Sequence, residues 1–438
     1  MTKKAIVIAG VNSGCGKTTI TLGLMAAFKK IGLSVQGFKV GPDYIDPSLH
    51  KEITGFPSVN LDSWMMPEKF IKYSFSYRTK NADISVVEGV MGLYDGKSAI
   101  SDQGSTSDLA VKLKLPVVLV VNAKSMARTA AAIVKGLIDF NPELNIIGVI
   151  FNRIGSENHL KILRDSINKY CGIPVLGGLK NIEFQIPSRH LGLYMGDEGI
   201  LLPDEIDYLA NQVIKNIDIN YLLDLSIISI EKHPNPINNK TKKIPKKRIA
   251  IARDRAFCFY YQDNIDILKS LGYEIINFSP INDQKLPENI DAIYFGGGYP
   301  ELYAQKLSNN KKIKEEIYDK STNGTIIYAE CGGLMYLGKY MTTIDGIKYP
   351  MIGAIEYETC MQKKLQNLGY VEIMPDQDFF IFNKKIKIRG HVFHYSKIKI
   401  TIDIPNFYSG EPESKAIGFK QGNILVSYVH LHFSNLLY

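Results

Sequence analysis

Short runs of β-branched and other apolar residues alternate with longer amphipathic segments from residue 4 to about residue 225. Several of the short runs are apolar throughout, as strands that helices cover on both faces must be. The longer segments have the 3.6-residue spacing of helices. This alternation predicts a doubly wound α/β domain with a parallel sheet, whose ligand site is expected at the carboxyl ends of the strands. The predicted strands are 5–9, 34–39, 84–88, 116–121 and 145–151, and the predicted helices are 18–31, 129–140 and 157–170.

The segment 226–247 loses this periodicity and contains three prolines, so it is interpreted as a linker between two domains. The first domain is expected at 1–225 and the second at 248–438. The second domain also begins with alternating strands and helices, and from roughly residue 350 it continues as alternating β-type runs. Its predicted strands include 248–252, 292–295, 325–328 and 423–428, and a helix is predicted at 264–271.

The composition changes this picture little. A chain of 438 residues is long enough for two or three domains, and its hydrophobic content of 45% is that of an ordinary soluble globular protein. Much of the net charge of +8 lies in one proline-bearing basic run at 240–248, which is interpreted as a solvated linker rather than as a helix that binds nucleic acid. The remaining positive charge suits a polyanionic substrate and a nucleotide.

The cysteines and the apolar runs indicate the compartment in which the protein is expected to act. The five cysteines show no CxxC spacing, which argues against a disulfide framework and against a zinc site. No apolar run approaches the roughly 18 residues that span a bilayer. We therefore expect a reduced, cytoplasmic protein that acts on small molecules, with neither nucleic acid nor a membrane as partner.

The segment 10–18, Gly-Val-Asn-Ser-Gly-Cys-Gly-Lys-Thr, follows a predicted strand and precedes a predicted helix, which is the context of a phosphate-binding loop. Backbone N–H groups of such a loop surround phosphate oxygens, while Lys17 can neutralise the β- and γ-phosphates and Thr18 can reach Mg²⁺. A glycine turn without a nucleotide is the alternative, and the agreement of loop, lysine, threonine and strand disfavours it. The expected ATP-binding residues are Gly10, Asn12, Ser13, Gly14, Gly16, Lys17, Thr18 and Thr19, with Asn152 as a candidate for reading adenine.

Acidic residues follow two other predicted strands of this half. Asp43 and Asp46 lie just past the second strand, where Mg²⁺, phosphate and an acceptor carboxylate would meet. Glu88 ends the third strand, in the position of a Walker-B-type acid. The expected metal ligands are Thr18, Asp43 and Glu88, although either aspartate alone could belong to an ordinary turn. Further out lie Asp95, Ser105 and Ser107, which are interpreted either as substrate contacts or, for the serines, as loop residues or helix caps.

In the second half, Cys331 stands between an apolar strand and two glycines, which is typical of a nucleophile elbow. The N–H groups of the following helix are expected to favour its thiolate. The glycines 296–298 offer backbone donors for an oxyanion, and His430 ends a strand near the C-terminus as a candidate base. A cysteine, a histidine and an oxyanion loop together would hydrolyse the side-chain amide of glutamine through a thioester, whereas an isolated cysteine would belong to the core. The glycines assigned to substrate binding are Gly296, Gly297 and Gly298.

Five motifs, at 41–46, 87–92, 296–301, 330–333 and 389–396, carry a resemblance that covers nearly the whole chain. The sequence resembles the cobyrinic acid a,c-diamide synthase family. Its first half is similar to dethiobiotin synthetase, and its second half is similar to class I glutamine amidotransferases that lack a full triad, which implies a flavodoxin-like second domain. By this resemblance Cys331 is the nucleophile, His430 increases its nucleophilicity, and the synthetase reaction needs Asp43, Asp46 and Glu88.

The resemblance implies ATP- and Mg²⁺-dependent amidation of the a- and c-carboxylates of cobyrinic acid through acyl phosphates, with ammonia from glutamine. A homodimer is compatible with it. Nickel-sirohydrochlorin and hydrogenobyrinic acid are alternative substrates, and a nucleotide-dependent partitioning or regulatory protein is an alternative of another class. Full-triad relatives carry a glutamate where this chain has His432, so a Cys–His dyad is expected and the choice between His430 and His432 as base stays open.

Overall fold

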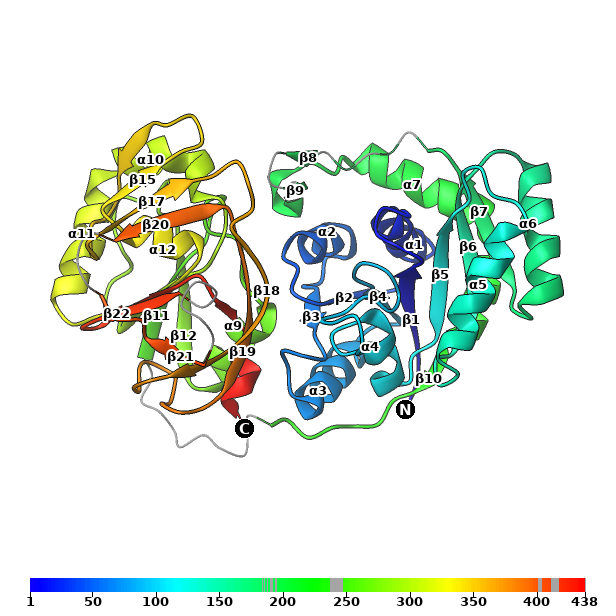
Figure 1. The fold of residues 1–438 in the computed structure, drawn as a ribbon, viewed down its shortest axis with the longest axis horizontal. Helices are drawn as coiled ribbons and strands as arrows, with labels where there is room; N and C mark the ends of the chain where they lie inside the picture. The colour runs from blue at the N-terminus through cyan, green and yellow to red at the C-terminus, as the bar shows by residue number, and fades with distance from the viewer. Residues whose placement is uncertain are drawn as a thin grey trace. The chain divides into compact units, whose positions relative to one another are not determined.

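The computed structural model of the chain describes residues 1–182, 184, 186, 188–189, 192–193, 195–236, 247–400, 404–410 and 417–437. These residues form two compact units, Met1–Pro234 and Asn235–Tyr438 (Figure 1). Most of the basic run at 240–248, interpreted above as a linker, lies outside the described residues. In the described ranges, none of the helices combines the length and the apolar character that crossing a membrane requires.

Unit 1 is built on the predicted parallel sheet. Its strands follow the order β3-β2-β4-β1-β5-β6-β7, and every neighbouring pair on this path is parallel. A further strand, β10 (Ile227–Ser229), lies in the segment expected as a linker and pairs antiparallel with the start of β1. The parallel strands are β1 (Thr2–Gly10), β2 (Val35–Val40), β3 (Val59–Leu61), β4 (Ile84–Glu88), β5 (Val117–Asn122), β6 (Ile146–Ile154) and β7 (Val175–Lys180).

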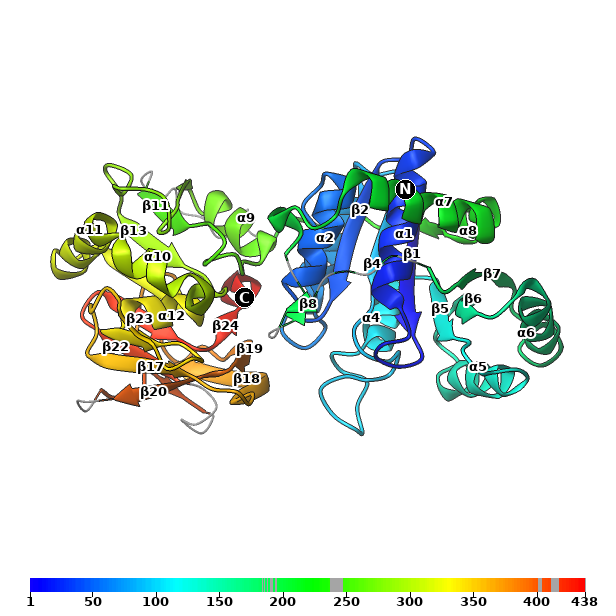
Figure 2. The ribbon, with the colours of Figure 1, turned by 90° about the horizontal axis from the view of Figure 1, so that it is seen from above.

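Helices connect these strands, so the doubly wound fold expected from the alternation is confirmed. Helices α1, α2 and α7 are neighbours in both views (Figure 1, Figure 2). Their apolar side chains form one core with Ile6, Ile8, Val86 and Val120 of the sheet, which explains why the residues on this face of the strands are apolar. The helices are α1 (Lys17–Lys30), α2 (Ile45–Thr54), α3 (Glu68–Thr79), α4 (Thr106–Leu113), α5 (Thr129–Phe140), α6 (Glu157–Tyr170), α7 (Pro203–Asn216) and α8 (Ile219–Leu225). Short elements are β8 (Ser188–Arg189), β9 (Gly192–Leu193) and the 3₁₀ turn η1 (Gly196–Glu198).

Unit 2 also contains a largely parallel sheet, in the order β12-β11-β13-β14-β23-β22, in which only β22 is antiparallel to its neighbour. Its strands are β11 (Lys247–Ala252), β12 (Tyr273–Phe278), β13 (Ala292–Phe295), β14 (Ile326–Glu330), β22 (Gly418–Gln421) and β23 (Ile424–Ser427). The helical elements are α9 (Gln262–Ser270), α10 (Ala304–Asn309), α11 (Lys311–Thr322), α12 (Gly332–Leu337) and the 3₁₀ turns η2 (Pro300–Tyr303) and η3 (Phe433–Leu437).

Two smaller four-stranded sheets account for the alternating β-type runs after residue 340. One has the order β16-β15-β17-β20 and the other β21-β18-β19-β24. After β23 the chain leaves the main sheet and pairs with β19, which places His430 opposite His391. The strands are β15 (Tyr340–Thr342), β16 (Lys348–Pro350), β17 (Tyr357–Met361), β18 (Asn367–Pro375), β19 (Ile388–His394), β20 (Ser396–Ile400), β21 (Tyr408–Ser409) and β24 (His430–Leu431).

Candidate active sites

The predicted phosphate-binding loop joins β1 to α1. Gly16 caps α1 in the left-handed conformation with φ 99°, and a Cβ there would lie 2.0 Å from Nδ2 of Asn152, so only glycine fits. Asn12, Ser13 and Gly14 are exposed at the tip of the loop. The ammonium of Lys17 donates to the carbonyl oxygens of Asn12, at 3.4 Å, and Met91. The lysine is therefore held across the loop, in a position from which it can meet an anion.

Asn152 braces this loop from β6. Its Nδ2 donates to the carbonyl oxygen of Cys15 at 3.0 Å, and its Oδ1 accepts from the backbone N–H of Arg153 at 2.9 Å. Both polar atoms of the side chain are therefore engaged within the protein. Contact with adenine stays a prediction for Asn152: each of the two atoms makes one of these hydrogen bonds and has the chemistry for a second.

An acidic cluster lies at the carboxyl ends of β2 and β4. The strand register sets Lys39 directly opposite Glu88. The Nζ atom of Lys39 lies 2.5 Å from Oδ2 of Asp46, 3.4 Å from Oε1 of Glu88 and 4.0 Å from Oδ2 of Asp43. All but Asp43 are buried. The structure thus brings the three predicted carboxylates around one buried cation that the sequence analysis did not assign.

The groups of this cluster shift one another's pKa values. Burial opposes the charge of Lys39, but Asp46, Glu88 and Asp43 together outweigh burial and raise its pKa. Burial, reinforced by the carboxylates of Asp43 and Glu88, raises the pKa of Asp46. Burial also disfavours the charge of Glu88, yet Lys39 and the hydrogen bond from His50 hold its pKa below the ordinary range. Burial and the neighbouring carboxylates thus oppose a negative charge on Asp46, and a further cation beside the cluster would favour its ionised form.

Glu88 is the most connected acid of the cluster. Its Oε1 accepts from the hydroxyl of Thr18 at 2.6 Å, and its Oε2 lies 2.7 Å from Nε2 of His50. The other ring nitrogen of His50 lies 3.0 Å from the hydroxyl of Ser58. The sequence analysis missed this role of His50 and assigned no role to Lys39. The signal for Lys39 was a lysine between two apolar residues at the end of a predicted strand, close to the two aspartates.

The residues predicted to bind Mg²⁺ fit that ion by their chemistry. Within the described ranges, no group of three or more His, Cys, Asp or Glu side chains is arranged as a preformed metal site. Mg²⁺ commonly takes only one or two carboxylates from the protein, together with substrate phosphates and water. Thr18, Asp43 and Glu88 supply such oxygens next to the phosphate loop, and a divalent cation there would favour the ionised form of the carboxylates.

The three predicted substrate-binding residues of unit 1 differ in their exposure to solvent. Asp95 is exposed, and its Oδ2 accepts from the backbone N–H of Gly92 at 2.9 Å. Ser105 and Ser107 are fully buried with their hydroxyls 2.8 Å apart, and Ser105 caps α4 by accepting from the N–H of Asp108. Asp95 is therefore accessible to a substrate, whereas the serines have the geometry of the helix-cap alternative.

In unit 2, Cys331 occupies a sharp turn between β14 and α12. Its φ of 48° and ψ of −100° are rare for a residue with a side chain, which is the strain typical of a nucleophile elbow. The turn is held by its neighbours: the N–H of Cys331 donates to the carbonyl oxygen of Ser427 at 2.7 Å, and its own carbonyl accepts from Met335 at 3.1 Å. The conformation places the thiol beyond the end of the sheet.

The thiol itself is buried and neutral. Cys331 is 7% exposed, and its Sγ lies 3.9 Å from the carbonyl oxygen of Phe393. Burial raises the pKa of this thiol to about 12, and the carboxylates of Glu301 and Glu330 add to the increase. The N–H of Gly332 opposes it more weakly. The N–H of Gly332 favours the thiolate, in the direction expected of the helix, but burial outweighs it in this state of the protein.

The three glycines after β13 lie between the cysteine turn and the histidine. The N–H of Gly296 donates to the hydroxyl of Tyr260 at 2.7 Å, which leaves the N–H groups of Gly297 and Gly298 as the candidates to bind an oxyanion. A Cβ on Gly297 would lie 2.6 Å from Cε1 of His430, and a Cβ on Gly332 would lie 3.1 Å from the nitrogen of Gly298. The loop thus lies against His430 and against the residue that follows Cys331.

The two candidate bases lie in different surroundings. His430 packs on Gly297, its ring stacks on that of His391 at 4.9 Å, and its Nδ1 lies 3.8 Å from Oε2 of Glu330. The Nδ1 of His432 lies 2.7 Å from the hydroxyl of Ser434, and its Nε2 lies 3.9 Å from Asp263 on α9. Burial lowers the pKa of both histidines to about 3. Only the surroundings of His430 include the glycine loop, so the geometry supports His430 as the base.

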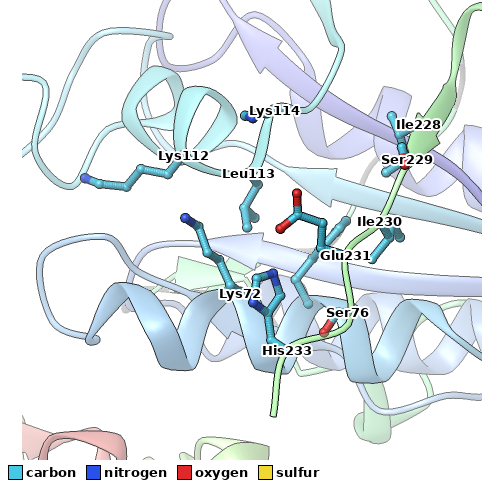
Figure 3. A pocket seen from close by; sticks show the side chains of 11 residues that line it. Lys72, Ser76, Lys112, Leu113, Lys114, Ile228, Ser229, Ile230, Glu231 and His233 are labelled. Carbon is cyan, nitrogen blue, oxygen red and sulfur yellow. The ribbon is translucent and has the colours of Figure 1, made fainter. Parts of the chain in front are cut away.

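A separate pocket in unit 1 has a cavity volume of about 110 Å³ and is lined by residues of α3, α4 and the segment around β10 (Figure 3). Since β10 pairs with the first residues of β1, this pocket lies at the opposite end of that strand from the phosphate loop. Its lysines Lys72 and Lys112 already pair with Glu68 and Asp108. We assign no function to this pocket.

Two family models match the chain. Residues 6–191 match the CobQ/CobB/MinD/ParA nucleotide binding domain, and residues 248–437 match the CobB/CobQ-like glutamine amidotransferase domain. Together with the fold, these matches define an enzyme that joins a nucleotide-binding domain to a glutamine amidotransferase domain.

Three relatives that are all named cobyrinate a,c-diamide synthase extend this match to the whole chain. The relative from Priestia megaterium is 42% identical over 99% of this chain and 95% of its own length, that from Listeria innocua is 42% identical over 98% and 96%, and that from Dehalococcoides mccartyi is 44% identical over 98% and 95%. The chain belongs to the cobyrinate a,c-diamide synthase family, as its motifs predict.

Proposed function

We propose that this protein amidates the a- and c-side-chain carboxylates of cobyrinic acid in cobalamin biosynthesis, using ammonia from glutamine and activation by ATP. The names of its relatives support the substrate. The observation that carries the proposal is the presence in one chain of a phosphate loop beside an acidic cluster and of a strained cysteine turn joined through a glycine loop to a buried histidine. The first pair suits phosphoryl transfer, and the second suits hydrolysis of an amide.

In the glutaminase reaction, His430 accepts the thiol proton of Cys331 as the sulfur attacks the side-chain carbonyl carbon of glutamine. The carbonyl oxygen becomes an oxyanion, for which the N–H groups of Gly297 and Gly298 are the candidate donors. His430 then gives its proton to the departing nitrogen, ammonia leaves, and a thioester remains on Cys331. Water that loses a proton to His430 hydrolyses the thioester to glutamate and restores the thiol.

In the synthetase reaction, the phosphate loop and Lys17 hold the phosphates of ATP. An oxygen of the substrate carboxylate attacks the γ-phosphorus, the bond to the β–γ bridging oxygen breaks, and an acyl phosphate and ADP form. Ammonia then attacks the acyl carbon and displaces phosphate, a much better leaving group than the oxygen of a carboxylate. Bound by Thr18, Asp43 and Glu88, Mg²⁺ would stabilise the charge that develops on the transferred phosphoryl group.

A pair of variants tests the division of labour. Cys331→Ser should lose amidation with glutamine but keep amidation with ammonium salts, since only the nitrogen source is removed. Lys17→Ala should lose product formation with either nitrogen donor and still hydrolyse glutamine. Full glutamine-dependent activity of Cys331→Ser would refute the glutaminase assignment, and an undiminished rate of Lys17→Ala would refute the role of the phosphate loop.

The macrocycle is tested with a panel of cobyrinic acid, hydrogenobyrinic acid and nickel-sirohydrochlorin. Mass spectrometry of each reaction counts the amides that are added. We expect two amides on cobyrinic acid. If one of the other macrocycles gave the higher kcat/KM, that macrocycle would replace cobyrinic acid in this proposal. Carboxylate labelled with ¹⁸O should transfer its label to phosphate if the acyl phosphate forms.

A further inference from the structure

Glu330, the residue before the nucleophile, is a buried carboxyl that the proposed reaction does not use. It ends β14 and is 1% exposed. Its Oε1 accepts from the hydroxyl of Tyr328 at 2.6 Å and from the N–H of Leu431 at 3.2 Å. Its Oε2 accepts from the hydroxyl of Tyr294 at 3.2 Å and lies 3.8 Å from Nδ1 of His430.

This arrangement orients the carboxyl towards the histidine. Burying a carboxyl in a strand end is costly, so one that persists there needs compensating donors. Tyr328 and Leu431 both bind Oε1, which fixes the rotation of the group and leaves Oε2 on the side of His430. Tyr294 then supports Oε2 from β13. Three elements of the main fold therefore hold one carboxylate oxygen close to one ring nitrogen of the base.

We propose that Glu330 positions His430 for catalysis by accepting a hydrogen bond from its Nδ1–H, so that Nε2 exchanges the proton with the thiol of Cys331. The proposal rests on the glutaminase reaction proposed above. As His430 becomes an imidazolium, the negative oxygen attracts it, and the separation of 3.8 Å shortens to a hydrogen bond. The acid of this triad thus precedes the nucleophile, instead of following the histidine by two residues, where His432 stands.

The charge of Glu330 makes this role dependent on pH. Burial raises its pKa to about 7, while the donors Tyr328, Leu431 and Tyr294 limit the increase. Below this value the carboxyl is neutral and stabilises the imidazolium poorly, so the glutaminase rate should rise through neutral pH. The other titratable groups that interact with Glu330, with His430 or with their neighbours are Tyr260, Tyr294, Glu301, Tyr328, Cys331, His391, His394 and Tyr408.

Glu330→Gln in the full chain is the first test. The amide keeps an acceptor for Tyr328 but presents an N–H group to Nδ1, which favours the wrong tautomer of His430. We expect kcat with glutamine to fall roughly 10²-fold or more while KM for glutamine changes little. The rising limb of the pH profile near neutrality should disappear. Amidation with ammonium salts, measured on the same preparation, reports whether the protein has folded.

Tyr294→Phe is the second test, and it decides the question even if Glu330→Gln fails to fold. It removes a donor to Oε2 without touching the carboxyl, so the pKa of Glu330 rises. The rising limb should therefore move to higher pH while the plateau at high pH is retained. A purely structural role of Glu330 would leave the position of the limb unchanged, and that result would overturn the proposal.

Cys331→Ala separates failure of this inference from failure of the proposed function. If Cys331→Ala still used glutamine, the glutaminase reaction itself would be wrong. If Cys331→Ala lost glutamine use while Glu330→Gln kept the wild-type kcat and pH profile, only the role of Glu330 would be refuted.

Discussion

The two candidate sites of this protein differ in the charge of their reactive side chains before a substrate binds. The cluster of unit 1 keeps formal charges in the resting state, with the ammonium of Lys39 among three carboxylates. In the site of unit 2 the nucleophile and the base are neutral instead: the pKa of the Cys331 thiol is raised to about 12 and that of His430 is lowered to about 3. Both sites are buried, so burial alone does not decide whether a group is charged. The neighbours do: carboxylates surround the ammonium of Lys39 and favour its charge, whereas the carboxylates of Glu301 and Glu330 oppose the thiolate of Cys331 and only the N–H of Gly332 favours it.

The difference matches the substrates that each site would handle. A polyphosphate carries negative charge before it binds. Charged side chains of the site can therefore pair with one another in the free protein and with the phosphates in the complex. Glutamine presents a neutral amide, and charge develops there only during the reaction. A neutral thiol and a neutral imidazole hold no charge that would have to be desolvated in the resting protein. The comparison therefore predicts that removing a charged side chain lowers stability in unit 1, whereas removing the neutral base lowers catalysis in unit 2.

Lys39→Met should have the largest effect on stability. Removal of the ammonium takes the cation away from the buried carboxyl of Asp46, while Glu88 keeps His50 and Thr18, and breaking a buried ion pair in this way costs about 3–5 kcal/mol. Urea unfolding at pH 8 measures the loss, and lower pH should recover part of it as the carboxylates take up protons. The matched control is Lys30→Met, which removes an exposed partner of Asp207 and should change the unfolding free energy far less. Equal stability of the two variants would show that the buried charge of Lys39 contributes no more to stability than an exposed one.

His430→Asn should have the converse effect, a large loss of catalysis without a comparable loss of stability. Its ring is neutral in the resting protein, so the variant removes no paired charge. The kcat with glutamine should fall by about 10²- to 10⁴-fold, while amidation with ammonium salts is kept. His432→Asn is the matched control, because that side chain binds Ser434 and lies away from the glycine loop. If His432→Asn lost the activity instead, the base would have been assigned to the wrong histidine.

Parts of each site could be read from neighbouring residues in the sequence. The phosphate loop and the cysteine turn are contiguous, so Lys17 and Cys331 could be predicted from the residues beside them. The partners Lys39 and Glu88 meet through the register of β2 and β4, which a single sequence does not contain. Glu330 was part of a quoted motif, yet its partner His430 is 100 residues away and reaches it through β24.

Glu330→Gln should change how the stability of the protein depends on pH. A buried carboxyl with a pKa of about 7 against an ordinary 4.5 binds its proton more tightly in the folded protein than in the unfolded one. Stability therefore falls as pH rises from about 4.5 to about 7, by up to roughly 3 kcal/mol. Glu330→Gln should remove this slope and be the more stable protein at pH 8, as measured by urea unfolding across that range. Glu88 has a lowered pKa, so Glu88→Gln should instead destabilise the protein at neutral pH. A slope that Glu330→Gln left unchanged would contradict this assignment.

Ser105→Ala should have the smallest effect, and it tests whether a residue near the charged site belongs to it. The hydroxyl of Ser105 caps α4 and is fully buried, so its loss should cost about 1 kcal/mol of stability, as for other helix caps. The KM for the macrocycle should stay at the wild-type value. Asp95→Asn provides the contrast, because Asp95 is exposed and keeps its turn-forming oxygen in the variant, so any increase in KM would report a lost charge at the substrate. Thermal unfolding and steady-state kinetics of the two variants separate the roles. A raised KM for Ser105→Ala at unchanged stability would return Ser105 to the substrate site, and the charged site of unit 1 would then extend as far as α4.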